Sequence, residues 1–219
     1  MSDSDDDIPQ LSAETLAALK EFYDQKFEKE EMLKAALENS ESIDDLEFDE
    51  DWQLSQFWYD DNTALALAKE AARAAGDTGS VALISCPTLF NKLKKLAPDL
   101  QVTLFEYDRR FAVFGEDFIL YDYRMPLDIP RCLAGSYSVV IADPPFLSEE
   151  CLSKTAITVK YLAKDKIILC SGAVMEDLAK RLLDVRKCLF RPQHKNNLAN
   201  EFLCFANYDL DEHIPNPCV

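Results

Sequence analysis

The sequence predicts an α/β protein with a seven-stranded, doubly wound Rossmann-like sheet that ends in an antiparallel hairpin. Two observations carry this prediction. From residue 80 onwards, short apolar runs alternate with amphipathic helical stretches, as in parallel strands joined by helices. The last two apolar runs have only a loop between them, which indicates a hairpin. A hydrophobic content of 48% supports a full core.

Acidic side chains are concentrated at the N-terminus. Residues 1–61 hold 20 acids and 4 bases, whereas the remaining 158 residues hold 20 acids and 19 bases. We therefore predict an acidic arm over residues 1–51, with one helix capped by Ser12 and a linker, and a folded domain over residues 52–219. Such an arm attracts basic protein surfaces and repels phosphate backbones. The alternative is a solvating tail.

The domain elements follow from the apolar pattern. A helix capped by Asn62 is expected to end near Gly76. The runs expected to form strands are residues 81–85, 102–107, 118–123, 137–142, 167–170, 187–192 and 201–208. The stretches expected to form helices between them are residues 88–96, 149–162 and 174–183.

The fourth strand ends in an unusual corner, Asp143-Pro144-Pro145-Phe146. The prolines have no N–H to donate, so the strand ladder must stop there. In open α/β sheets, ligands bind at the carboxyl ends of the strands. The corner is therefore expected to face a binding crevice. The alternative is a strand merely ended by a proline turn.

Three acidic residues mark the ends of the two preceding strands. Glu106 and Asp108 end the second strand, and Asp122 ends the third. Acids in this position of dinucleotide folds accept hydrogen bonds from ribose hydroxyls, and we prefer Asp108 to Glu106 because it lies nearer the crevice. Asp122 is placed to accept from an adenine amino group. For any single acid the alternative is a helix N-cap or a surface turn.

The first loop, which contains Ser85 and Pro87, has no glycine. A pyrophosphate needs close backbone approach, so the loop argues against NAD and FAD. S-adenosylmethionine, which has no phosphate, remains as the candidate cofactor. Methyl transfer to an amine requires an aligned nitrogen lone pair. The Asp143 carboxylate and the Pro144 carbonyl would hold the hydrogens of that amine, and Phe146 would wall the site.

Several segments together resemble a known family. The corner matches the [DNS]-PP-[YFW] motif of S-adenosylmethionine-dependent amino-methyltransferases. Residues 50–208 resemble the protein-lysine methyltransferases of translation elongation factor 1-alpha, formerly described as N6-adenine-specific DNA methyltransferases. The segments that carry the resemblance are WQLSQFWY, FEYDRRF, ADPPFLSEECL and NLANEF. The resemblance implies S-adenosylmethionine as cofactor and elongation factor 1-alpha as substrate. The glycine-free first loop departs from the usual methyltransferase pattern.

Two further segments are expected to flank the site. In amino-methyltransferases the segment before the sheet folds over the cofactor, which assigns Trp58 to cofactor binding and Tyr59 to the substrate channel. The alternative is that these aromatic side chains pack the arm onto the sheet.

The loop before the last strand supplies the remaining polar candidates. Asn197, Asn200 and Glu201 are predicted to contact the substrate, although asparagines in loops usually only shape turns. His194 is predicted to be an exposed loop residue.

Three functions compete: lysine methylation, adenine methylation of DNA or RNA, and cofactor binding without activity. An adenine enzyme needs basic residues on its binding face, and the sequence shows no basic stripe, so nucleic acid is disfavoured as a direct substrate. The intact corner disfavours an inactive protein. Seven spaced cysteines without a CxxC pair indicate reduced thiols, no metal site and a cytoplasmic location. No apolar run has the length of a membrane span. We expect a monomer.

Overall fold

The computed structural model divides into two compact units, Met1–Leu46 and Glu47–Val219. It describes residues 54–196 and 200–214 without a gap, together with residues 12, 14–17, 20, 21, 24, 48, 50 and 51. In the first unit, residues 14–17 are helical and the Thr15 N–H donates to Ser12 Oγ at 3.1 Å, as expected of an N-cap. The rest of the predicted arm helix and most of the linker lie outside the described residues.

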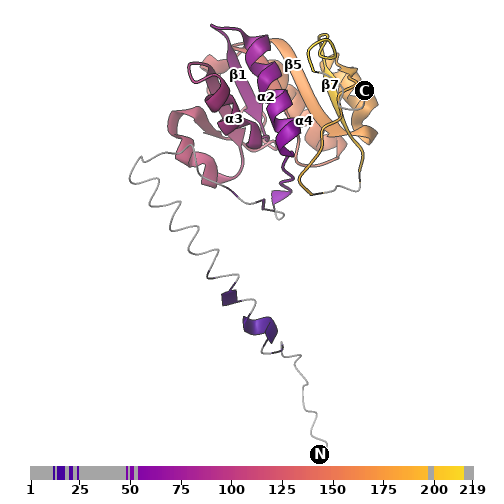
Figure 1. Ribbon diagram of the computed structural model, residues 1–219. Coiled ribbons are helices and arrows are strands. Elements are labelled where there is room, and N and C mark those ends of the chain that lie inside the picture. The colour runs from indigo at the N-terminus through magenta and orange to yellow at the C-terminus, as the bar shows by residue number, and fades with distance from the viewer. Residues whose placement is uncertain are drawn as a thin grey trace, which may run out of the picture. The chain divides into compact units, whose positions relative to one another are not determined.

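The second unit contains one seven-stranded sheet with the order β3-β2-β1-β4-β5-β7-β6 (Figure 1). Neighbouring strands from β3 to β5 are parallel, and β7 is antiparallel to both β5 and β6. The bounds are β1 Ser80–Ile84, β2 Gln101–Glu106, β3 Phe118–Leu120, β4 Tyr137–Ala142, β5 Ala163–Gly172, β6 Arg186–Lys187 and β7 Phe202–Ala206. The predicted fold class, with its terminal hairpin, is confirmed.

Helices cover the sheet. α2 packs against α3, β1 and β4, and in Figure 1 it crosses the front of the sheet. α4 packs against α5, and its apolar residues join a buried cluster with alternate residues of β1, β4 and β5. Because side chains alternate across a strand, the two helix pairs bury opposite faces. The bounds are α2 Asp61–Ala75, α3 Thr88–Leu96, α4 Glu149–Leu162 and α5 Glu176–Leu183.

Some elements differ from the sequence prediction. Asp60, and not Asn62, caps α2, because its carboxylate accepts from the Thr63 N–H at 2.7 Å. The link from β2 to β3 is the 3-10 segment η3, Arg109–Asp117, for which no helical stretch was singled out in the sequence. The link from β3 to β4 contains only the short 3-10 turn η4, Arg131–Leu133. A third short turn, η5, Ala173–Met175, precedes α5.

The strand order places the switch point between β1 and β4. The chain runs outward from β1 to β2 and β3, and then from β4 to β5 on the other side. At such a point the connecting helices leave in opposite directions and open a crevice at the carboxyl ends of the strands. Among the described residues, no helix is long and apolar enough to span a bilayer.

Candidate active site

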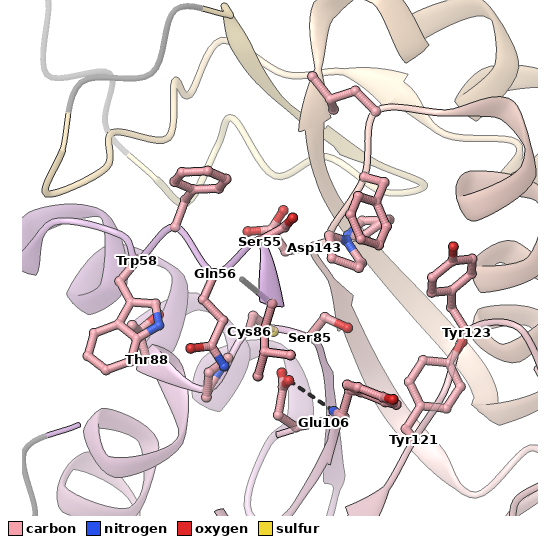
Figure 2. Close-up of a pocket in the computed structure, with 18 of the residues that line it drawn as sticks. Ser55, Gln56, Trp58, Ser85, Cys86, Thr88, Glu106, Tyr121, Tyr123 and Asp143 are labelled. Atoms are coloured by element: carbon pink, nitrogen blue, oxygen red, sulfur yellow. Dashed lines mark hydrogen bonds between the residues drawn. The ribbon is translucent and has the colours of Figure 1, made fainter. Parts of the chain in front are cut away.

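A cavity of about 440 Å³ opens at the carboxyl ends of β1, β2 and β4 (Figure 2). Residues 54–59, which we call the strap, form one wall. The other lining residues are Ser85–Thr88, Glu106, Tyr107, residues 121–124, residues 143–147, His194, Asn200 and Phe202. The cavity therefore joins the predicted strand ends with two segments that are distant in sequence.

The end of β1 forms its turn without glycine. Ser85 adopts φ of 55°, a left-handed conformation that costs free energy in a residue with a side chain, and its N–H donates to the Phe105 carbonyl at 2.9 Å. Cys86 Sγ donates to the Ile141 carbonyl at 3.6 Å. No side chain caps the N-terminus of α3, which begins at Thr88 on the cavity wall. Ser85 thus takes the conformation that a glycine would favour.

Glu106 is the acid that β2 presents to the cavity. Its side chain is buried, and Oε1 accepts from the Tyr107 N–H at 2.9 Å and the Asp108 N–H at 3.1 Å. Burial raises the pKa of the Glu106 carboxyl to about 7, although these hydrogen bonds work in the opposite direction. The residue is therefore balanced between its protonated and ionised forms near neutral pH.

Asp108, the preferred acid in the sequence prediction, does not line the cavity. It is 5% exposed, and its carboxylate accepts from the side chains of Gln56 at 2.9 Å and Arg110 at 2.8 Å. Its other oxygen accepts from the Arg110 N–H and caps η3. Burial acts to raise the Asp108 pKa, but the bonds from Arg110 and Gln56 outweigh it and lower the pKa.

Asp122 lines the cavity from a turn beyond β3, because that strand already ends at Leu120. Its Oδ1 accepts from the Arg124 N–H at 2.9 Å. Asp122 therefore both shapes a turn and contributes to the cavity wall.

The corner after β4 closes the opposite side of the cavity. The Asp143 N–H donates to the Ile84 carbonyl at 3.0 Å, which fixes the corner beside the end of β1. Asp143 is half-buried, and desolvation raises its pKa to about 7, with a smaller contribution from the charge of Glu106. Phe146 is 40% exposed and its ring meets Tyr123 edge-on at 5.8 Å. An acceptor and an aromatic wall thus stand side by side.

The strap is joined to the loop before β7. Tyr59 forms an antiparallel bridge with His194, and their rings lie 5.2 Å apart. Within the described part of the chain, Trp58 Nε1, Tyr59 Oη and His194 Nε2 are buried without a hydrogen-bond partner. Tyr59 interacts electrostatically with Asp143 without a hydrogen bond of ordinary geometry, and burial followed by that charge raises its pKa. All three residues line the cavity.

His194 is half-buried, so its prediction as an exposed loop residue is wrong. Its ring packs between Tyr59 and Phe202, and burial lowers its pKa, which keeps the imidazole neutral near pH 7. Sequence reasoning gave no role to Gln56, although it lies in the WQLSQFWY segment, and none to His194, because neither residue follows a strand.

The remaining candidates from the loop before β7 differ in whether they line the cavity. Asn200 lines the cavity, whereas Glu201 does not, and its carboxylate lies 4.0 Å from Arg191 Nε. Asn197 lies outside the described residues. Among the described residues, no group of three or more His, Cys, Asp or Glu side chains is arranged to hold a metal ion.

Comparisons with known proteins support a methyltransferase. Residues 50–210 match the protein family described as "Probable N6-adenine methyltransferase". A branched-chain polyamine synthase from Thermus thermophilus, solved with 5'-methylthioadenosine, has a similar fold with a TM-score of 0.53. It is 10% identical and covers 73% of this chain and 59% of its own. Fold, site and family match together define the class as an α/β methyltransferase with a Rossmann-like sheet.

Full-length relatives narrow the class. EEF1A lysine methyltransferase 1 of Gallus gallus is 54% identical over 210 residues, which cover 95% of this chain and 98% of that protein. The Homo sapiens protein of the same name is 52% identical over 212 residues, which cover 95% of this chain and 97% of that protein. The chain belongs to the EEF1A lysine methyltransferase 1 family, which confirms the resemblance found in the sequence.

Proposed function

We propose that the protein transfers methyl groups from S-adenosylmethionine to a lysine of translation elongation factor 1-alpha. The observation that carries the proposal is the Asp143–Phe146 corner, which lines a cavity at the switch point of a methyltransferase sheet. Relatives more than half identical over nearly the whole chain support the substrate. An enzyme with this substrate would work in the cytoplasm, and we propose that it acts as a monomer.

The residues of the cavity fit S-adenosylmethionine. Glu106, with one carboxylate oxygen already held by backbone N–H groups, would accept from the ribose hydroxyls, in place of the Asp108 that the sequence favoured. Asp122 would accept from the adenine amino group, and Ser85 and Pro87 would border the nucleoside. The unpartnered Trp58 Nε1 would donate to the methionine carboxylate. Bound there, the cofactor supplies an electrophilic methyl group.

The corner would hold the target amine. The Asp143 carboxylate and the Pro144 carbonyl would accept from the amine hydrogens, which orients the nitrogen lone pair. As positive charge develops on nitrogen, the interaction with an ionised Asp143 strengthens, so the residue stabilises the transition state more than the ground state. Pro145 keeps the corner rigid, and Phe146 would flank the aliphatic part of the lysine.

Deprotonation of the lysine is assigned to its surroundings and not to Asp143. A lysine ammonium has a reference pKa of about 10.4, and an ionised carboxylate favours that charged form. Desolvation among Tyr59, Phe146 and Tyr123 would lower the lysine pKa and release the proton to water. Asn200 would contact the same substrate segment inside the cavity. Asn197 and Glu201 are proposed to contact the protein substrate outside it.

Adenine methylation is the second candidate, favoured by the description of the matching family. The charges of the cavity argue against it. Three carboxylates and a single arginine, Arg124, are found among the described lining residues, and a polyanion would need the opposite balance.

The two functions are separated by one experiment. The full-length protein is incubated with S-adenosylmethionine carrying a labelled methyl group and, in parallel, with purified elongation factor 1-alpha, duplex DNA, single-stranded DNA and RNA. We expect label on the protein only, at lysine by mass spectrometry. Label on adenine, with none on the elongation factor, would overturn the proposal.

A further inference from the structure

A partly buried charged network connects the strap to the end of β2. Asp108 accepts from the Gln56 side-chain N–H at 2.9 Å and forms an ion pair with Arg110 at 2.7 Å. Arg110 in turn donates to Gln56 Oε1 at 3.1 Å, and the Asp51 N–H donates to the same oxygen at 2.9 Å. The described hydrogen bonds of the Gln56 side-chain amide are therefore made with Asp51, Asp108 and Arg110.

Only one of the three side chains reaches the cavity. Gln56 lines it, whereas Asp108 and Arg110 do not. Figure 2 shows Ser55, Gln56 and Trp58 along the strap, with Glu106 at the β2 end. Asp108 and Arg110 thus hold a cavity wall from behind, without meeting a bound ligand themselves.

The strap has a second attachment and a strained residue. The Trp58 N–H donates to Glu50 Oε1 at 2.8 Å, and the Lys195 N–H donates to the Trp58 carbonyl at 2.8 Å. Directly before Gln56, Ser55 adopts φ of 55°. A left-handed serine persists only where its surroundings over-determine it. The side-chain bonds of Gln56 therefore add to the backbone bonds from Leu54 and Gln56 to the Asp51 carbonyl in holding this end of the strap.

We infer that Asp108 and Arg110 are positioning residues that latch the strap over the cavity through Gln56, and so set how long the cofactor stays bound. The inference rests on the proposed function, because it takes S-adenosylmethionine as the ligand. It gives Asp108 an indirect role in cofactor binding and leaves the ribose to Glu106.

The ionisation of Asp108 and the burial of its partner Gln56 support this positioning role. The lowered pKa of Asp108 keeps its carboxylate ionised across the neutral range, so the ion pair with Arg110 does not depend on pH there. Because Asp108 is 5% exposed and Gln56 is 8% exposed, loss of one partner leaves another buried polar group unsatisfied. The strap would then be released at the Gln56 end.

The first test measures dissociation of S-adenosylmethionine from the full-length protein by stopped-flow displacement. Arg110→Ala should speed dissociation about tenfold. The matched control is Asp117→Ala, which removes the 2.7 Å ion pair with Lys94 at the other end of η3 and does not line the cavity. Its dissociation rate should equal that of the wild type. Arg110→Ala with a wild-type dissociation rate would overturn the latch.

Coupling separates a latch from general destabilisation. In a Gln56→Ala background the latch is already open, so adding Arg110→Ala should change the dissociation rate less than twofold. An undiminished tenfold effect in that background would show that Arg110 acts elsewhere.

A ligand-free measurement separates the inference from the proposed function. In the wild type, hydrogen exchange of the amides in residues 54–59 should be slow, and Arg110→Ala should speed it while leaving β1 and β4 protected. If the wild type did not bind S-adenosylmethionine, that result would overturn the proposed function. Unchanged strap exchange in Arg110→Ala would overturn the latch whether or not the cofactor binds.

Discussion

Asp108 and Asp143 are the same residue type just after a buried parallel strand, yet their surroundings give them opposite properties. Asp108 is held by Arg110 and Gln56, which lower its pKa and turn it away from the cavity. Asp143 has no cationic partner among the described contacts, so desolvation raises its pKa to about 7. The comparison teaches that an acid at a strand end becomes a candidate for chemistry when the fold leaves it without a positive partner.

The largest expected effect is on turnover at Asp143. Asp143→Ala should lower kcat by about 100-fold or more, because it removes an acceptor whose interaction strengthens as charge builds on nitrogen. Affinity for S-adenosylmethionine, measured by calorimetry, should stay within a few-fold of the wild type. Asp108→Ala should show the reverse pattern, with weaker cofactor binding and a smaller loss of kcat. Wild-type kcat in Asp143→Ala would reduce the corner to a simple turn.

The pH dependence of cofactor affinity tests whether Glu106, and not Asp108, accepts hydrogen bonds from the ribose. Its pKa of about 7 means that the carboxylate becomes a stronger acceptor for ribose hydroxyls as the pH rises through 7. Cofactor affinity should therefore increase between pH 6 and pH 8. Glu106→Gln should bind about tenfold more weakly at pH 8 and lack this increase, as measured by calorimetry at both pH values. The same increase in the Gln variant would exclude Glu106 as its source.

The ionised carboxylate of Asp143 should lower the free energy of unfolding, whereas that of Asp108 should raise it. The raised Asp143 pKa favours the protonated form in the folded state, so its destabilising effect begins near pH 4 and grows until the pH passes about 7. Asp143→Asn should therefore gain about 4 kcal/mol more unfolding free energy at pH 8 than at pH 4.

Asp108 contributes stability that is present above its unfolded pKa and is lost as the pH falls through its lowered folded pKa. Asp108→Ala should thus lose about 2 kcal/mol equally at pH 6 and pH 8. Urea denaturation of Asp143→Asn at pH 4 and pH 8, and of Asp108→Ala at pH 6 and pH 8, tests both expectations. A gain at Asp143→Asn that is independent of pH would contradict the assigned desolvation.

The smallest expected effect concerns the acidic arm. Deleting residues 1–46 should leave cofactor affinity unchanged, since the unit Glu47–Val219 contains the whole described cavity. Methylation of the elongation factor should slow about two- to threefold at low salt and recover at high salt, because exposed charge attraction is screened. Equal rates for both proteins at every ionic strength would favour a solvating tail.

Much of the fold was accessible from the sequence because its signals are local. The runs at residues 88–96 and 149–162 coincide with α3 and α4, and the terminal hairpin follows from the missing helical pattern between the last two runs. The Asp143 corner was also predicted from a local signal, because two consecutive prolines end a strand. No element was predicted for residues 109–117, where the structure forms the 3-10 segment η3 capped by Asp108.

The sequence by itself determined the alternation of strands and helices, the acids at their ends and the proline corner, because these depend on residues a few positions apart. Only the tertiary structure decided which acid faces the cavity. Gln56 meets Asp108 across 52 residues, and Thr63 accepts from the Gln193 N–H across 130. Such pairings carry no periodic signal in the chain, and they decide burial and charge partners. The choice between Glu106 and Asp108, and the enclosure of His194, therefore belong to the folded molecule.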